Sequence, residues 1–396
     1  MRAFLISLFV AEVVLSAYLP QAFNNSIFKS PEYTTSQGGA ASCISGRVDL
    51  SVSFESQQWT FDIPENQLQL TDWVFTYTTL GTAAFSSNGT RRINKSYEIW
   101  VQYCIPKPAG LAIFNASSLQ ILTHGGSLDH SYWDFAQGYS YVDAAAAQGM
   151  ATLNYDRLGI GHSEHPDPLF EVQGDAATSV LHSLITLARN GAFGHTFAKV
   201  IGVGHSYGSK ITESIVSNYP KDFDAVLLTG YAYRNAVGAG NPIASGYEVA
   251  QSDRRFTHLP HGYVATRYPE GIHLLFFKYP NFDQAIFTAS LASLQTTTLG
   301  EMLIPNEEAL VGNITSLQAY SGSVMILVGN KDYSVCGFSC DGDDNPAAST
   351  LRDIFPSVNP SHSKIWIVPD IGHNTSLHSN AAEVFGGMLS WVRKLN

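Results

Sequence analysis

The stretch Val200-Ile201-Gly202-Val203-Gly204-His205-Ser206-Tyr207-Gly208-Ser209-Lys210 decides the fold of this chain. Residues 198–203 form a short apolar run typical of a buried strand, and 211–219 have the apolar spacing of a helix. The glycines of Gly204-x-Ser206-x-Gly208 suit a turn so tight that a Cβ at either flanking position would clash with neighbouring backbone. The pattern predicts that Ser206 stands on a sharp strand-to-helix turn at the carboxyl edge of a sheet.

A pentapeptide of this kind is a weak indication by itself, because glycine and serine are common. An ordinary Gly/Ser turn is the alternative interpretation. A dinucleotide-binding motif is disfavoured, because Gly202-x-Gly204-x-x-x-Gly208 has the wrong last spacing. The helix that follows Ser206 would direct free backbone N–H groups at it, and these favour developing negative charge. Ser206 is therefore a candidate nucleophile whose partners must be sought elsewhere in the chain.

Composition limits the classes of function. The chain has 396 residues, of which 45% are hydrophobic and 14% charged. This is enough for a large core, in one large domain with an insertion or in two domains. The formal net charge of −11 argues against a nucleic-acid partner. No apolar run of about 18 residues follows the N-terminal segment, so no spanning helix is expected and no stable membrane insertion.

The N-terminus resembles a secretory signal, with Arg2 followed by the apolar stretch 4–15 and a small residue such as Ser16 or Ala17 at its end. Glu12 interrupts that stretch, so a short membrane anchor or a buried helix is the alternative. Residues 1–17 are predicted to be a signal peptide and the protein to be secreted. Six N-x-S/T sequons agree with a glycoprotein; they begin at Asn24, Asn88, Asn94, Asn115, Asn313 and Asn374.

Four cysteines are present, and they allow three pairings. We favour disulfides between Cys43 and Cys104 and between Cys336 and Cys340, with free thiols as the alternative. The absence of C-x-x-C spacing argues against a zinc or redox site. His162 and His165 have the spacing of a metal pair but no third ligand nearby in the sequence, so no metal is expected.

The order of elements indicates the architecture. Residues 48–107 read as β, with alternating polar and apolar positions. Strands then alternate with helices, which implies crossovers and a parallel sheet. The expected strands are 119–123, 150–155, 198–203, 225–228, 323–328 and 364–368, and the expected helices are 131–147, 174–189, 211–219 and 376–393.

The segment 231–318 interrupts this alternation and is too long for an ordinary loop. It is rich in glycine, proline and aromatic residues, with helical pieces, and an insertion at this edge of a sheet commonly covers the ligand crevice. We therefore divide the chain into a signal peptide (1–17), a first core part (18–230, β-rich to about 110), a cap or lid insertion (231–318) and a second core part (319–396). Aromatic side chains in the insertion suggest an apolar pocket, although such residues are more often core; they are Tyr231, Tyr233, Tyr263, Phe276 and Phe277.

A serine nucleophile needs a base, and the base needs an acceptor that orients it. Asp332 follows the strand 323–328, and His373 follows the strand 364–368. Both therefore lie in loops at the carboxyl edge that holds Ser206, and their order in the chain is the order expected on such a sheet. Weaker candidates for the acid are Asp341, Asp343, Asp344 and Asp370.

The loop His124-Gly125-Gly126 follows the strand 119–123 at the same edge. A tetrahedral intermediate places charge on an oxygen, and preorganised N–H donors stabilise it. The backbone N–H of Tyr207 is one candidate donor, and that of Gly126 is the other. A plain glycine-rich turn is the alternative.

With these elements the chain resembles the α/β-hydrolase superfamily, and its secreted fungal-type members most. The resemblance rests on Thr123–Gly126, on Tyr155–Ser163, on the Gly204–Gly208 turn, and on Asp332 and His373. It implies an α/β-hydrolase fold, a mostly parallel mixed sheet with helices on both faces and a helical cap insertion. It covers the chain from about Leu119 onwards, and no catalytic role is carried over to the Asp156–Ser163 loop.

We therefore interpret the chain as a secreted serine hydrolase that cleaves a carboxylic ester or lactone by acyl transfer to water, without a cofactor. Ser206, His373 and Asp332 are the expected triad, and Gly126 and Tyr207 the expected oxyanion hole. The expected partner is a small, apolar acyl substrate. An alternative is a tailoring hydrolase or lyase-like enzyme of small-molecule biosynthesis that uses the same triad. A non-catalytic binding protein is less favoured, because every catalytic position holds a competent residue.

Overall fold

The computed structural model describes residues 23–107, 118–234, 240–266, 268–303, 313–337, 339–342 and 345–395. The expected signal peptide, the sequon at Asn115 and the alternative acids Asp343 and Asp344 lie outside these residues. Within them, no helix is both long enough and apolar enough to cross a membrane.

A nine-stranded mixed sheet forms the centre of the molecule, in the order β1-β2-β3-β5-β4-β6-β7-β11-β12. The strands β1, β2, β3 and β5 pair antiparallel, and the pairs from β5 to β12 are parallel. This confirms the expected architecture. The bounds are β1 Lys29–Thr35, β2 Ala41–Trp59, β3 Ser87–Pro106, β4 Ser118–Thr123, β5 Ala151–Tyr155, β6 Lys199–His205, β7 Ala225–Thr229, β11 Ser323–Gly329 and β12 Lys364–Val368.

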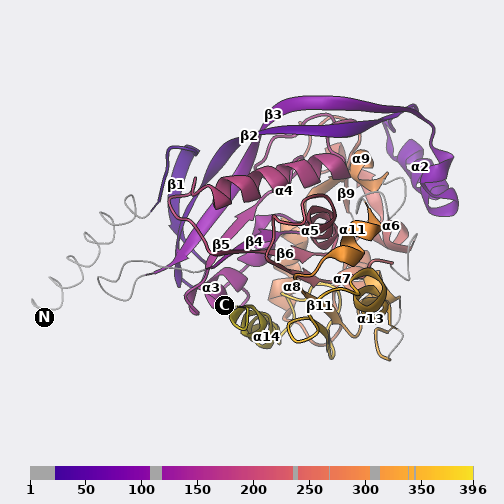
Figure 1. The fold of residues 1–396 in the computed structure, drawn as a ribbon. Helices are drawn as coiled ribbons and strands as arrows, with labels where there is room; N and C mark the ends of the chain where they lie inside the picture. The colour runs from indigo at the N-terminus through magenta and orange to yellow at the C-terminus, as the bar shows by residue number, and fades with distance from the viewer. Residues whose placement is uncertain are drawn as a thin grey trace, which may run out of the picture.

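Helices cover both faces of the sheet (Figure 1). On one face α4 (Gly174–Arg189) and α5 (Tyr207–Asn218) bury their apolar residues against the strands, with α11 (Ile314–Ala319) beside α5. On the other face α3 (Tyr141–Ala146) and α14 (Ala381–Arg393) form a second apolar layer. The parallel strands other than the edge strand β12 are buried on both sides, which explains why they read as largely apolar runs.

The β2–β3 hairpin is long and extends beyond the rest of the sheet (Figure 1). The connection between its two strands contains a helix. This helix, α2 (Gln67–Leu80), lies in the stretch 48–107, for which strands and no helix were expected. Asn66 caps its start by accepting the backbone N–H groups of Leu68 and Gln69. Trp73 packs in a small separate cluster with residues that include Trp59 and Leu169, so distant contacts stabilise the helix.

Two other helices are shorter than expected. The stretch 131–147, expected to be one helix, contains only α3 and a 3-10 turn, η2 (His130–Trp133). Ser140 is the N-cap of α3, since its hydroxyl oxygen accepts the N–H of Asp143, and the helix therefore begins there. The last helix starts at Ala381 rather than 376, since the residues before it fold into a loop closed by His378 Nδ1 on the Asn374 carbonyl at 2.8 Å.

Both disulfides form with the expected pairing. Cys43–Cys104 joins β2 to β3, and Cys336–Cys340 closes a short loop after β11.

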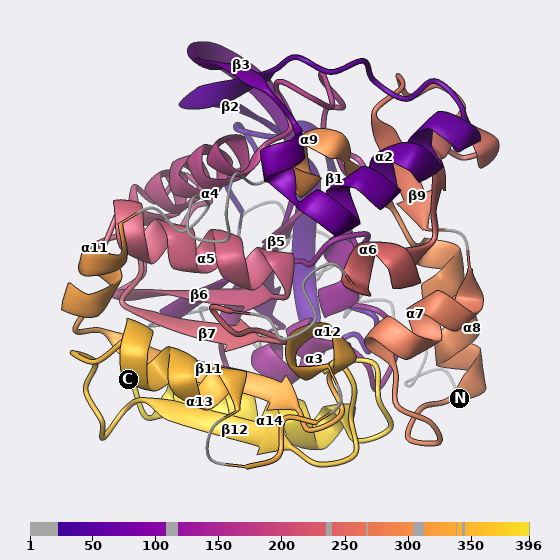
Figure 2. The ribbon, with the colours of Figure 1, turned by 90° about the vertical axis from the view of Figure 1, so that its right-hand side faces the viewer.

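The segment 231–318 contains helices and also a three-stranded antiparallel sheet, which the helical pattern did not predict. The sheet has the order β10-β9-β8. Figure 2 shows α6, α7, α8 and β9 grouped on one side of the molecule. The bounds are α6 Gly240–Ser245, β8 Tyr247–Val249, β9 Tyr263–Thr266, α7 Pro269–Phe276, α8 Gln284–Ser293, β10 Thr296–Thr298 and α9 Leu299–Met302.

This segment contacts the loops at the carboxyl edge of the large sheet. Gln295 N donates to the carbonyl of Ser127 at 2.9 Å, and Asn374 N donates to the carbonyl of Phe276 at 2.8 Å. Both core residues lie in loops that follow strands, β4 and β12 respectively. The segment is therefore placed over the edge where the candidate site residues are found.

Candidate active site

Ser206 stands at the turn between β6 and α5, as predicted. Its φ of 54° and ψ of −120° lie outside the regions that a serine ordinarily adopts, and its N–H is held by the carbonyl of Thr229 at 2.8 Å. A Cβ on Gly204 would lie 2.5 Å from Ser209 Cα, and one on Gly208 would overlap the carbonyl of Thr123. The two glycines are thus required by the close approach of backbone around the serine.

The predicted base and acid form a buried pair. His373 Nδ1 lies 2.8 Å from Asp332 Oδ2, and both side chains are almost fully buried. The other carboxylate oxygen, Oδ1, accepts the N–H of Val335 at 2.9 Å, because Asp332 caps the short helix α12 (Tyr333–Cys336). With the proton of a neutral imidazole on Nδ1 directed to Asp332, Nε2 is left as an acceptor.

The alternative acids do not compete with Asp332 in the part of the chain that the structure describes. Asp341 is exposed and bonds to Lys331 Nζ at 3.1 Å and to Asn330 Nδ2. Asp370 has an exposed side chain and a φ of 56°, in a turn before the His373 loop. The carboxylate that His373 contacts is that of Asp332.

The last residue of β6 and the loop after β12 come together close to Gly230. Its φ of 55° favours glycine, and a Cβ there would lie 2.9 Å from His205 Cε1 and 3.0 Å from His373 Cε1. The ring centroids of His205 and His373 are 5.0 Å apart, and Ser206 directly follows His205. The chain thus brings Ser206, His373 and Asp332, which are far apart in sequence, to one edge of the sheet.

Aromatic rings surround this point. Phe276 from the 231–318 segment stacks on His373, with centroids 5.6 Å apart, and Tyr132 stacks on His205 at 4.4 Å. Burial keeps His205 neutral by lowering its pKa well below the ordinary value, and the neighbouring His373 lowers the pKa further. Four of the five aromatic residues noted in the segment, Tyr231, Tyr233, Tyr263 and Phe277, are buried in the packed core, whereas Phe276 reaches the site. No motif in the sequence indicated that Tyr132 would stack on the histidine next to Ser206.

The loop after β4 lies against the serine. A Cβ on Gly125 would be 3.1 Å from Ser206 Cβ, while one on Gly126 would meet no atom within 4 Å. Gly126 therefore borders open space beside Ser206. Tyr207 is the first residue of α5, where backbone N–H groups lack acceptors within the helix.

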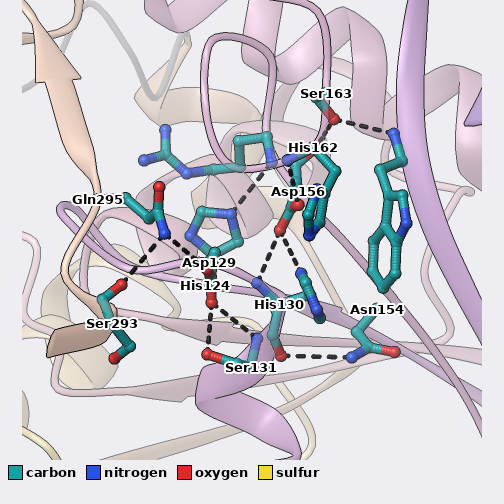
Figure 3. Close-up of polar contacts among 12 residues, drawn as sticks. His124, Asp129, His130, Ser131, Asn154, Asp156, His162, Ser163, Ser293 and Gln295 are labelled. Atoms are coloured by element: carbon teal, nitrogen blue, oxygen red, sulfur yellow. Dashed lines mark hydrogen bonds and ion pairs between the residues drawn. The ribbon is translucent and has the colours of Figure 1, made fainter. Parts of the chain in front are cut away.

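Two hydrogen bonds define the tautomer of His124, the first residue of this loop, whose ring is labelled in Figure 3. Arg157 N donates to His124 Nε2 at 3.1 Å, so Nε2 carries no proton, and Nδ1 donates to the Gly125 carbonyl at 3.0 Å. Burial, assisted by the charge of Arg157, lowers the pKa of His124 to about 3. The ring is therefore neutral at ordinary pH and serves to bind backbone.

The Asp156–Ser163 loop is held by its own network, shown in Figure 3. Asp156 bonds to the Nδ1 of His130 at 2.7 Å and to the N–H of His162 at 2.8 Å. Burial acts to raise the pKa of Asp156, but His130 and these bonds outweigh it and lower the pKa to about 2. Among the described residues, no group of three or more His, Cys, Asp or Glu is arranged to hold a metal ion; His162 lies beside Trp100 instead.

The sequon at Asn374 is expected to carry no glycan. Asn374 follows His373 and is 1% exposed, and its Thr375 and Ser376 are fully buried, whereas Asn88 and Asn94 are exposed on β3. Folding would therefore withdraw this sequon from modification. Peptide mapping by mass spectrometry should find Asn88 and Asn94 as the main occupied sites; an active protein with high occupancy at Asn374 would require a different base than His373.

Comparison with known proteins agrees with the fold. A sequence profile of the alpha/beta hydrolase family matches residues 120–386. No curated protein matches the sequence. Among solved structures, a thermophilic esterase from Thermogutta terrifontis is similar with a TM-score of 0.50 and 16% identity, covering 75% of this chain and 94% of that one. A protein described as a non-heme bromoperoxidase from Mycobacterium tuberculosis has a TM-score of 0.50 and 13% identity, covering 71% and 94%. At these identities the likeness to the two structures is one of fold.

Proposed function

Because the chain belongs to the alpha/beta hydrolase family, we propose that it is a secreted serine hydrolase that cleaves a carboxylic ester or lactone of a small molecule. The observation that carries the proposal is the buried His373–Asp332 hydrogen bond of 2.8 Å at the edge where Ser206 occupies its constrained turn. A buried carboxylate bonded to Nδ1 leaves Nε2 as a general base, which is the arrangement that activates a serine.

In the proposed reaction, Ser206 Oγ attacks the acyl carbon while His373 Nε2 takes the hydroxyl proton. The C–O bond to the leaving alkoxide then breaks, and His373 returns the proton to that oxygen. Water attacks the acyl-enzyme by the same route and releases the carboxylic acid. Asp332 fixes the tautomer and stabilises the imidazolium that forms.

The negative oxygen of each tetrahedral intermediate would accept from the backbone N–H groups of Gly126 and Tyr207. One contact and one open space support the assignment of Gly126: Gly125 lies against Ser206, and a Cβ on Gly126 would meet no atom within 4 Å. Preorganised donors of this kind supply a large part of the catalysis in acyl transfer.

The 231–318 segment is proposed to act as the cap of the site. Phe276 stacks on His373 from this segment, and the backbone of Phe276 binds that of Asn374. The ring of Phe276 lies beside the proposed general base, His373. Contact with this ring would bury apolar surface of the substrate, which favours an apolar acyl group.

Rates on a chain-length series of activated esters and lactones, with the Ser206→Ala variant as control, test this function. We expect Ser206-dependent hydrolysis with kcat/KM rising with acyl chain length before it levels off. Absence of Ser206-dependent turnover across both series would contradict hydrolysis and favour another chemistry at the same triad.

The mature protein is expected to start near Ala17 or Tyr18 and to migrate above its calculated mass because of glycans. N-terminal sequencing of secreted material, with and without glycosidase, measures both. Secreted protein that starts at Met1 and does not respond to glycosidase would contradict the signal-peptide prediction.

A further inference from the structure

A buried ion pair connects the core to the 231–318 segment. Arg157, which follows β5, contacts Glu301 of α9 through Nη1 and Oε1, and the two residues are 1% and 5% exposed. Burying two charges costs free energy that their attraction often does no more than offset. The pair is therefore weak evidence for a purely stabilising role, and its other contacts indicate what it does.

Arg157 also contacts groups next to the proposed oxyanion donors, namely the Gly125 carbonyl and the side-chain ring of Tyr207. Its Nη2 donates to the Gly125 carbonyl at 3.4 Å, and its guanidinium carbon lies 4.8 Å from the centroid of the Tyr207 ring. The Gly125 carbonyl also accepts the Nδ1–H of His124 at 3.0 Å. Two donors thus converge on this one oxygen, and one of them is a cation.

The Gly125 carbonyl and the Gly126 N–H belong to the same peptide group. That peptide is trans, so the N–H points away from the oxygen that Arg157 and His124 hold. Holding the carbonyl on the buried side therefore directs the Gly126 N–H to the opposite side of the peptide. A Cβ on Gly126 would also meet no atom within 4 Å, so this residue borders open space. A cation at the oxygen also polarises the peptide and makes its N–H a better donor.

We propose that Arg157 is a positioning residue that orients the Gly125–Gly126 peptide for oxyanion binding, and that Glu301 of the proposed cap holds Arg157 in place. This inference rests on the proposed function, since it needs Gly126 as an oxyanion donor. On this proposal, the strength with which the core binds the oxyanion of the transition state depends on Glu301, a residue of the proposed cap.

Glu301 is itself held in place by the strand β10. Its Oε2 accepts the hydroxyl proton of Thr297 at 3.0 Å, and its N–H is bound by Thr298 Oγ1 at 3.1 Å. A displacement of β10 and α9 would remove the partner of Arg157. The orientation of the oxyanion loop is therefore coupled to the seating of this part of the proposed cap.

The test compares Arg157→Gln, Glu301→Gln and the double variant with the wild type. Arg92→Gln is the matched control, because Arg92 forms an exposed ion pair with Glu55 on the β2–β3 hairpin. For each protein, thermal unfolding is measured first, and kcat, KM and the affinity for an alkyl boronic acid follow below the unfolding range. The boronic acid forms a tetrahedral adduct on the serine and reports on the oxyanion hole without turnover.

Arg157→Gln is expected to lower kcat about 10- to 100-fold with little change in KM, because a misplaced group costs transition-state binding more than substrate binding. The affinity for the boronic acid should fall by a similar factor. Glu301→Gln should have a smaller effect, and it should add nothing further in the Arg157→Gln background if Glu301 acts through Arg157. Arg92→Gln should leave all three quantities unchanged.

Two results would overturn the inference. Folded Arg157→Gln protein with wild-type kcat and boronic acid affinity would mean that the ion pair is only structural. Independent, additive losses from the two single variants would mean that Glu301 does not act through Arg157. If the wild type itself shows no hydrolysis that Ser206→Ala removes, the proposed function fails, and the inference fails with it; a failure confined to the variants leaves the proposed function intact.

Discussion

Replacing Ser206 by alanine is expected to abolish turnover, with a loss on the order of 10⁴-fold or more in kcat. The hydroxyl is the only group removed, and in the proposed reaction it forms the bond to the acyl carbon. The backbone turn should survive, because the Thr229 carbonyl holds the N–H of residue 206 whatever its side chain. The measurement is kcat on the best ester of the series, together with thermal unfolding of both proteins.

The matched control is Ser209→Ala, three residues further on in α5. Ser209 Oγ bonds to the Thr229 carbonyl at 3.0 Å and is buried, so its loss affects stability rather than the reaction. Turnover by Ser206→Ala within tenfold of the wild type, from correctly folded protein, would remove Ser206 from the nucleophile role.

Asp332→Asn is expected to lower kcat more than about tenfold with KM almost unchanged. The asparagine side chain can direct its NH₂ group at His373 Nδ1, which moves the imidazole proton to Nε2 and leaves no acceptor for the serine proton. Its oxygen can still accept the N–H of Val335, so the cap of α12 is retained and the fold should persist.

Asp341→Asn provides the control, because Asp341 lies in the same loop region and its side chain is exposed. This variant should lose only a surface ion pair and keep its activity. If Asp341→Asn proved damaging and Asp332→Asn harmless, the assignment of the acid would be wrong.

The alternation of strands and helices was sufficient to predict the sheet and where its loops lie. Buried parallel strands read as apolar runs, and the residues after them share one edge by topology alone. This explains why Asp332 and His373 could be placed near Ser206 from the sequence, although only the structure gives the 2.8 Å bond between them.

The helix α2 could not be predicted, because what stabilises it is distant in sequence. Its apolar residues lie on more than one side, with Trp73 buried and Phe75 67% exposed, so no helical periodicity is visible. Trp73 packs with Trp59 and Leu169, and such tertiary contacts override local propensity. The shortened α3 has a local cause instead, since Ser140 caps it where a continuous helix was expected.

The ion pair between Arg157 and Glu301, beside the His124–Gly126 loop, also had no signal in the sequence. Arg157 and Glu301 are 144 positions apart, and each residue alone reads as an ordinary charged side chain. The His124-Gly125-Gly126 motif did indicate the loop, but the tautomer of His124 depends on the backbone N–H of Arg157. These roles follow from contacts between segments that the sequence pattern does not relate to one another.

Covalent labelling tests the central claim most directly. The protein is treated with an alkyl fluorophosphonate, digested and mapped by mass spectrometry, with Ser206→Ala treated in parallel. The account predicts a single phosphonyl adduct on the peptide that contains Ser206, formed with loss of esterase activity and absent from the variant. An adduct on another residue with equal loss of activity, or no adduct on an enzyme that hydrolyses esters, would contradict it.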